Sequence, residues 1–325
     1  MTEAPHDAGC VGAVVVRVDF GGCVLRTDDG VLHSATVAGR VRGRRKALGN
    51  AMVVGDRVSF EPGRSGGDET QAVVVAVAPR RNLFSRRAPG HRAVEQVVAA
   101  NLDQVLVVAS LVDPEFKPGF VDRVLAQCAF AGLPARLVVN KADLGAPAAS
   151  RALLEDYARA GIEGHVVSVK QRHGLEAVHE VLRGRRSLFV GHSGVGKSSL
   201  LNALEPTFEL LLGEVNARTG KGRHTTTAAL LLRPEPEVEL IDTPGVRAFG
   251  LWGIDPEQLI DYFPEFAPFR GGCRFADCRH ATEPGCTIRA SLADGAISRR
   301  RYDSFLKLRE ELRDELGHER PRASR

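Results

Sequence analysis

Gly191-His192-Ser193-Gly194-Val195-Gly196-Lys197-Ser198 fits the pattern GxxxxGK[ST]. The stretch follows a buried-type run, Leu188-Phe189-Val190, and precedes a helix-like segment that starts at Ser199. In this context the pattern predicts a phosphate-binding loop, because glycines let backbone amides approach phosphates and a helix N-terminus adds partial positive charge. Lys197 would neutralise the outer phosphates, and Ser198 would ligate magnesium. The alternative is a chance glycine-rich turn.

On both sides of this loop, residues 94–250 alternate strand-like and helix-like segments. Buried-type strands are predicted at 105–109, 137–139, 165–167, 188–190 and 238–241. Leu175, Val178 and Leu182 recur at helical spacing between two of them. The alternation predicts a mostly parallel sheet with helices on both faces, whose ligands bind at the carboxyl ends of the strands.

Asn140-Lys141-Ala142-Asp143 follows one of these strands. The Asp143 carboxylate can accept two hydrogen bonds from guanine, and adenine lacks that pair of donors. Asn140 would brace the surrounding loops, and the Lys141 stem would cover a face of the base. The tetrapeptide alone is a weak signal, but beside a phosphate loop in the same sheet it predicts guanine recognition.

Ser168-Val169-Lys170 follows the strand at 165–167, and there a backbone amide could meet the guanine carbonyl oxygen. An ordinary exit from a strand is the alternative interpretation. Both loops come before the phosphate loop in the chain, whereas the usual order places the phosphate loop first. A site assembled from strand ends survives such a permutation, because it does not depend on how the strands are connected.

Asp242-Thr243-Pro244-Gly245 ends the strand at 238–241. Asp242 can hold magnesium through water, and the Gly245 amide can sense the γ-phosphate. Upstream, Thr226 or Thr227 should complete the magnesium shell, and the sequence does not choose between them. The alternative for that upstream segment is a flexible polar loop. After this motif the chain runs directly into its C-terminal region, so switch movement could reach a separate domain.

Hydrolysis of a bound GTP requires a water molecule oriented for attack. Many GTPases orient this water with a glutamine directly after the Asp-x-x-Gly motif. Val246 occupies that position and cannot orient water, which predicts slow intrinsic turnover. His224 is a candidate catalytic residue, because a neutral imidazole can accept a proton or position water. The alternative is that His224 packs or points to solvent.

The regions flanking the predicted sheet differ from it in residue pattern. Short β-like runs at 12–18, 53–60 and 72–77, separated by turn residues, predict a small barrel of the OB type over residues 9–80. A basic linker is expected at 81–93. Residues 251–325 contain a cysteine cluster and then a charged helix with the apolar stripe Tyr302, Phe305, Leu308 and Leu312; disorder is expected from about Gly317.

Cys273, Cys278, His280 and Cys286 lie within one short segment of this C-terminal region. Three thiolates and one imidazole complete a tetrahedral zinc site, and no ligand position remains for water, so the pattern predicts a structural Zn²⁺ ion. The alternative is three free cysteines and an unrelated histidine.

Bulk composition fits a globular cytoplasmic protein. Hydrophobic residues make up 43% and charged residues 26% of the 325, and no apolar run reaches the roughly 18 residues needed to span a bilayer. The net charge of +4 does not demand a nucleic-acid partner, yet the basic residues are clustered. The clusters fall at 40–46, 80–92 and 299–301, where they could neutralise phosphates or form an ordinary solvated surface. We expect a monomer without membrane association.

The chain resembles one bacterial family over nearly its whole length. The resemblance is carried by Asn140 to Asp143, Gly191 to Ser199, the stretch Gly222-Arg223-His224-Thr225-Thr226-Thr227 and the predicted zinc ligands. The family is that of the circularly permuted GTPases that depend on the small ribosomal subunit, known as RsgA or YjeQ. The resemblance implies an N-terminal OB-fold, a central permuted GTPase domain and a C-terminal zinc domain. It also implies binding to the small (30S) subunit and its 16S rRNA during late maturation, with hydrolysis of GTP to GDP stimulated there.

Two other functions stay open at this level. One is a GTPase that serves RNA modification or metal delivery, which an open zinc coordination position or a fused modification domain would favour. The other is an RNA-binding scaffold in which the nucleotide is only structural. Very slow turnover that subunits do not stimulate would favour the scaffold.

Overall fold

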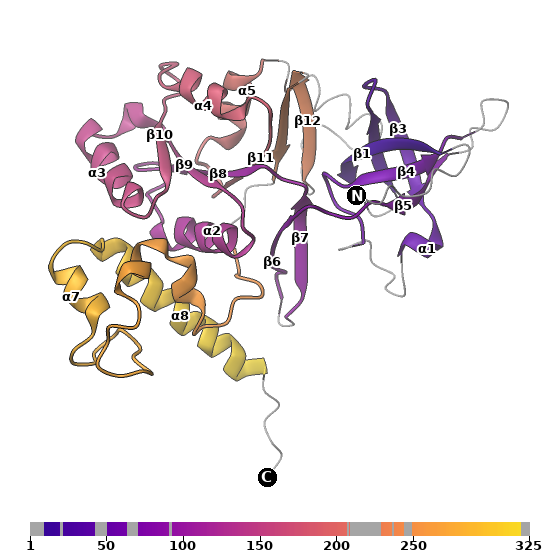
Figure 1. The fold of residues 1–325 in the computed structure, drawn as a ribbon. Helices are drawn as coiled ribbons and strands as arrows, with labels where there is room; N and C mark the ends of the chain where they lie inside the picture. Colours follow the sequence, from indigo (N-terminus) through magenta and orange to yellow (C-terminus); the bar gives the residue numbers. More distant parts are fainter. Residues whose placement is uncertain are drawn as a thin grey trace, which may run out of the picture.

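The structure is a computed structural model that describes residues 10–19, 22–42, 51–63, 71–90, 93–206, 208, 229–235, 237–243 and 249–319. In chain order it contains a small β-barrel, an α/β sheet and a helical C-terminal region, coloured indigo, magenta and orange to yellow in Figure 1. The α/β sheet lies between the other two parts (Figure 1). No helix in the described ranges is long and apolar enough to cross a membrane.

The N-terminal part is a closed barrel of five strands. The strands are β1 (Val11–Val18), β2 (Cys23–Thr27), β3 (Leu32–Val37), β4 (Arg57–Glu61) and β5 (Ala72–Val77), with the short helix α1 (Gly39–Arg42) after β3. They are ordered β1-β2-β3-β5-β4, and β4 pairs again with β1 to close the barrel. Alternation along the strands places Leu25, Phe60 and Val74 in its core. The predicted OB-type barrel is confirmed, although β4 begins only at Arg57 because residues 53–56 form a turn.

A two-stranded hairpin follows the barrel. It consists of β6 (Leu83–Arg87) and β7 (Glu95–Ala100), which pair antiparallel. Strand β6 lies inside the range that the sequence predicts as a basic linker. Phe84, its second residue, is fully buried and stacks on Phe249, with ring centroids 5.6 Å apart. The strand was not predicted because arginines lie on both sides of this single inward-facing aromatic residue.

The central sheet has the order β10-β9-β8-β11-β13-β12, and every neighbouring pair except β13–β12 is parallel. Its strands are β8 (Gln104–Ser110), β9 (Ala135–Asn140), β10 (Glu163–Val166), β11 (Arg185–Gly191), β12 (Leu230–Glu235) and β13 (Val238–Asp242). The connecting helices are α2 (Pro118–Phe130), η1 (Ala142–Leu144), α3 (Pro147–Ala158), α4 (Leu175–Leu182) and α5 (Lys197–Leu204). The prediction of a mostly parallel α/β sheet is confirmed.

The barrel and the central sheet are joined edge to edge. Strand β1 pairs antiparallel with β12, with Arg17 opposite Leu230. Arg186 of β11 reinforces the junction by binding Glu239 at 2.6 Å and donating to the carbonyl oxygen of Gly55 at 2.8 Å. Gly55 has a φ of +90°, and a Cβ atom there would lie 2.2 Å from the carbonyl oxygen of Ala100. Only glycine fits this position without a shift of the backbone.

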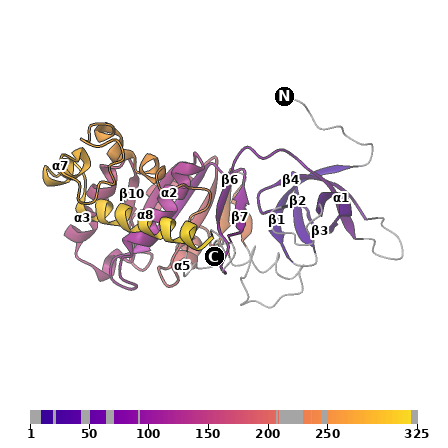
Figure 2. The same cartoon turned by 90° about the horizontal axis from the view of Figure 1, so that it is seen from below.

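The C-terminal region consists of helices and a loop that holds the cysteine cluster. Its helices are η2 (Leu259–Tyr262), η3 (Pro264–Phe269), α7 (Thr287–Ala293) and α8 (Arg299–Glu319). The predicted apolar stripe of α8 is confirmed, because Tyr302, Phe305, Leu308 and Leu312 are all buried. Disorder is predicted from about Gly317, but α8 continues to Glu319. In the views of Figures 1 and 2, α8 runs beside α2 of the central sheet.

The junction generates a stability prediction. Gly55→Ala should lower the free energy of unfolding by about 2–4 kcal/mol, since it combines a positive φ with a backbone collision. Gly30→Ala is a matched control, because Gly30 also has a φ of +90° but its Cβ would meet no atom within 4 Å. The control should cost only about 1 kcal/mol. Urea unfolding compares the two, and equal losses would contradict the collision at Ala100.

Candidate functional site

The predicted nucleotide-binding motifs meet at one edge of the central sheet. Strands β8, β9, β11 and β13 are parallel neighbours, so their carboxyl ends lie side by side. Each motif begins at the last residue of a strand: Asn140 ends β9, Gly191 ends β11 and Asp242 ends β13. Pairing in the sheet therefore brings together segments that are about fifty to a hundred residues apart in the chain.

The loop between β11 and α5 has the backbone that its glycines allow. Gly194 and Gly196 have φ angles of +89° and +85°. A Cβ atom at Gly196 would lie 2.5 Å from the Asn140 amide nitrogen. Ser193, Gly194, Ser198 and Ser199 are exposed, whereas Val195 is buried. The loop is thus anchored by one apolar residue and presents its polar groups outward.

Lys197 is the first residue of α5, and its ammonium group forms an ion pair with Asp242. Both side chains are buried. Burial raises the pKa of Asp242, and the adjacent Lys197 opposes that shift. The next residue, Thr243, donates its hydroxyl to the carbonyl oxygen of Phe189 at 2.8 Å. The phosphate-loop lysine and the acid expected on the magnesium side therefore lie in direct contact.

Asn140 connects the base-reading loop with the phosphate loop. Its amide nitrogen donates to the carbonyl oxygen of Val195 at 3.0 Å and lies 3.5 Å from that of Gly196. Asn140 is only 2% exposed, so water competes little for this bond. Asn140 thus bonds directly to the loop that it was expected to brace.

Asp143 lies beside the second predicted base-contacting loop. The Ser168 hydroxyl donates to its carboxylate at 2.6 Å, and this bond lowers the pKa of Asp143. The backbone amide of Ala142 donates to the carbonyl oxygen of Val167 at 3.1 Å, which connects the two loops further. Asp143 is therefore an ionised acceptor at neutral pH, as recognition of the two guanine donors requires.

Sequence reasoning does not single out the segment 111–117, between β8 and α2. The Lys141 ammonium group donates to the carbonyl oxygen of Asp113 at 2.5 Å. The Nζ atom of Lys117 lies 3.3 Å from Nε2 of His192 in the phosphate loop. The segment could have been predicted from its position, because it follows a strand whose carboxyl end lies at the same edge of the sheet. His224, Thr226, Thr227 and Gly245 lie outside the described residues.

The predicted basic clusters are only partly available to phosphates. Arg301 is 1% exposed and binds two carboxylates. Arg80 forms two hydrogen bonds, of 2.8 and 2.9 Å, with the buried Asp56. The cluster prediction is therefore wrong for Arg301, because its charge is already neutralised inside the protein.

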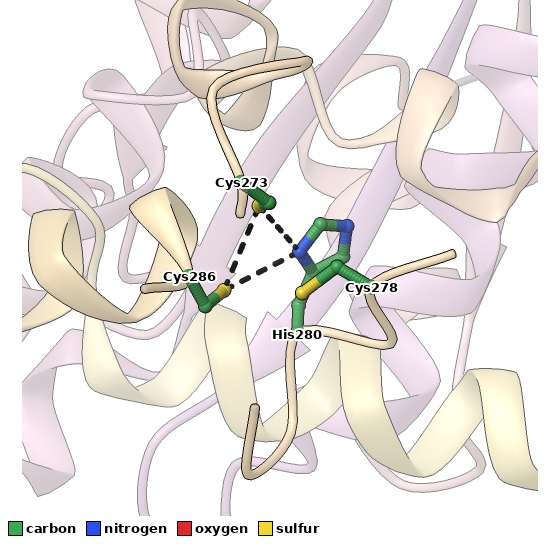
Figure 3. A group of neighbouring side chains, drawn as sticks. All are labelled: Cys273, Cys278, His280 and Cys286. Carbon is green, nitrogen blue, oxygen red and sulfur yellow. Dashed lines mark hydrogen bonds between the residues drawn. The ribbon is translucent and has the colours of Figure 1, made fainter. Parts of the chain in front are cut away.

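The four predicted zinc ligands converge in the C-terminal region (Figure 3). The ligand atoms of Cys273, Cys278, His280 and Cys286 all lie within 4.8 Å of one another. The Nδ1 atom of His280 is 3.5 Å from the sulfur of Cys273 and 3.4 Å from that of Cys286, and those two sulfurs are 3.9 Å apart. A tetrahedral zinc ion with bonds of about 2.0–2.3 Å needs ligand atoms about 3.5–3.8 Å apart. The donor set therefore fits zinc.

Neighbouring groups fix the loop that carries these ligands. The Glu283 carboxylate accepts hydrogen bonds from the backbone amides of residues 279, 281 and 282. Its own backbone amide and these three amides lower the pKa of Glu283 to about 2. Tyr302 of α8 donates its hydroxyl to the carbonyl oxygen of His280 at 2.5 Å. Burial lowers the pKa of His280, and Arg309 adds to the shift. The imidazole is therefore neutral at neutral pH, which is the form that binds metals.

Comparison with known sequences points to one family. The family described as RsgA GTPase matches residues 77–252. A small ribosomal subunit biogenesis GTPase RsgA from Gemmatimonas aurantiaca is 43% identical over 301 residues, which cover 92% of this chain and 96% of the relative. A protein of the same name from Chlorobaculum tepidum is 39% identical over 307 residues, covering 93% and 98%.

Solved structures agree on the architecture. YjeQ from Thermotoga maritima matches with a TM-score of 0.71 at 30% identity, covering 93% of this chain and 98% of that one. YloQ, described as a circularly permuted GTPase, matches with a TM-score of 0.68 at 23% identity, covering 96% and 98%. The second match supports the fold alone. It agrees with a sheet in which the strand of the Asn140 motif precedes the strand of the phosphate loop.

The cysteine cluster generates a metal prediction. The purified chain should carry one Zn²⁺ ion, measured by mass spectrometry of the metal. Cys286→Ser should lose the ion and lower the melting temperature, because a serine hydroxyl is a poor substitute for a thiolate. Cys10→Ser is the control, since Cys10 lies outside the cluster, and it should keep the metal. Full zinc content in Cys286→Ser would contradict the proposed ligand set.

Proposed function

The chain belongs to the RsgA GTPase family, and on that premise we propose that it hydrolyses GTP to GDP and phosphate during late maturation of the small (30S) ribosomal subunit. Its relatives are named for the biogenesis of that subunit, and they align along nearly their whole length with this chain. Docking with GTP bound and release after hydrolysis would make it a timed assembly factor.

One contact carries the nucleotide part of this proposal. The hydrogen bond of 3.0 Å from Asn140 to the carbonyl oxygen of Val195 holds the base-reading loop against the phosphate loop. A single nucleotide can therefore reach Asp143 with its base and Lys197 with its phosphates. The proposed GTP-binding residues are Asn140, Lys141, Ala142, Asp143, Ser168, Val169, Lys170, Gly191, His192, Ser193, Gly194, Val195, Gly196, Lys197, Ser198, Ser199, Thr226, Thr227, Asp242 and Gly245.

Phosphoryl transfer depends mainly on position and on neutralised charge. Lys197 supplies positive charge at the outer phosphates. Ser198 and Asp242 would hold Mg²⁺, which adds positive charge there when it is bound. Val246 offers no group to orient water, so intrinsic turnover is slow, and His224 is the proposed replacement. Ordering of its segment on the subunit would explain stimulation.

The remaining parts support docking on the subunit. Cys273, Cys278, His280 and Cys286 would hold a structural Zn²⁺ ion that stabilises the C-terminal region. Exposed basic residues around the barrel and the C-terminal helices would contact phosphates of 16S rRNA. We propose that the protein works as a monomer in the cytoplasm, where subunits mature.

Guanine selectivity tests the role of Asp143. Asp143→Asn removes the carboxylate that accepts both guanine donors, so affinity for GDP should fall on the order of 100-fold, and affinity for ADP should stay as weak as before. Calorimetry measures both affinities. Asp29→Asn is the control, because Asp29 is an exposed carboxylate in the barrel, away from the site. Unchanged preference for guanine in Asp143→Asn would refute this assignment.

Hydrolysis on purified 30S subunits tests the biological role. The wild-type chain should hydrolyse GTP slowly alone and faster with subunits, and Lys197→Ala should abolish both activities. His224→Ala should keep nucleotide affinity and lose the stimulation, because only the oriented water depends on it. Absence of stimulation in the wild-type chain would remove the ribosomal role. Intact stimulation in His224→Ala would leave that histidine without a catalytic role.

A further inference from the structure

The structure contains a buried ion cluster between the C-terminal region and the central sheet. Arg301 of α8 donates from Nε and Nη2 to the Glu265 carboxylate of η3, at 2.6 and 3.2 Å. Its Nη1 donates to the Asp122 carboxylate of α2 at 2.6 Å. Asp122 is fully buried and Arg301 is 1% exposed. One guanidinium group thus fastens α8 to a helix of the central sheet.

Two aromatic rings enclose the same guanidinium. Its central carbon lies 4.4 Å from the ring centroid of Phe263 and 5.5 Å from that of Tyr157. Tyr157 belongs to α3, the helix that follows the Asn140 motif, and it is fully buried. Arg301 therefore contacts α2 and α3, two of the helices that follow loops of the proposed nucleotide site.

The first turn of α2 is in contact with that site. Phe120, two residues before Asp122, packs edge-on against the His192 ring of the phosphate loop, with centroids 5.9 Å apart. Lys117, which precedes α2, lies 3.3 Å from the same histidine. The preceding segment accepts the hydrogen bond of Lys141 at Asp113. Asp122 is within about one and a half helical turns of Phe120 and Lys117 along the chain, and Asp113 lies in the segment that leads into the same helix.

Buried ion clusters contribute little net stability compared with apolar residues of similar volume, but their hydrogen bonds have fixed directions. A forked guanidinium held by two carboxylates sets where α2 lies relative to α8. Apolar packing alone would leave the two helices freer to slide, because it has no preferred direction. The cluster is therefore suited to fixing the position of α2.

We propose that Arg301 and Asp122 are positioning residues for nucleotide binding, which hold the start of α2 against the phosphate loop and the Lys141 loop. The C-terminal region would then form part of the frame of the nucleotide site. This inference rests on the proposed function only in requiring that the chain binds guanine nucleotides.

Asp122→Ala tests it in the full-length chain, because Arg301 keeps Glu265 as a partner and no buried charge is left alone. Affinities for GDP and for a non-hydrolysable GTP analogue should fall about tenfold, measured by calorimetry. Asp122→Asn keeps an acceptor oxygen and should restore most of the affinity. Arg299→Ala is the matched control, because Arg299 lies on the same helix and pairs with Asp303 at the surface. It should bind nucleotides like the wild-type chain.

The rise in melting temperature on GDP binding distinguishes a positioning role of Asp122 from a merely structural one. A merely structural contact would lower the melting temperatures of the free and GDP-saturated protein equally, whereas a positioning contact also reduces the difference between them. GDP affinity within twofold of wild type in a folded Asp122→Ala protein would overturn the proposal. If that variant does not fold, Asp122→Leu/Glu265→Met/Arg301→Met removes all three charges together and is judged by the same criteria. Failure of the wild-type chain to bind GDP would instead refute the proposed function.

Discussion

The hydrogen bond from the Asn140 amide to the carbonyl oxygen of Val195 is the contact on which the proposed nucleotide site depends. It joins two loops that follow different strands of one parallel sheet. It also requires glycine at position 196, because a Cβ atom there would collide with the same amide nitrogen at 2.5 Å. A buried side chain and a bare backbone together set the spacing between the base-reading and phosphate-binding ends of the site.

The permuted order changes what the site is connected to. In the chain, the Asp242 motif is followed by the C-terminal region, and that region returns to the sheet through α8 and Arg301. At the other end of the chain, the barrel adds its β1 to β12 and so extends the same sheet. Both flanking parts are therefore attached to the nucleotide-binding core by hydrogen bonds and ion pairs, in addition to the covalent chain.

Patterns with a strict local rule were predictable. The buried strands at 105–109 and 188–190 read as continuous apolar runs, because both faces of a parallel sheet are covered. The clustering of Cys273, Cys278, His280 and Cys286 could be predicted because the four residues fall within fourteen positions, and their side chains converge in the structure. Strand β6 could not be predicted, because Phe84 is its only buried aromatic residue and the arginines around it suggested a linker.

Short segments were enough to identify the residues proposed to bind a nucleotide and a zinc ion, since the chemistry of such sites is written in local residue types and spacing. The reversed order of the motifs is likewise a fact of the chain. The burial of Arg301, one of three consecutive arginines, between Asp122 and Glu265 became visible only in the folded protein. The physical reason is that the partners of a charged side chain are set by the packing of distant helices, and local sequence carries no record of that packing.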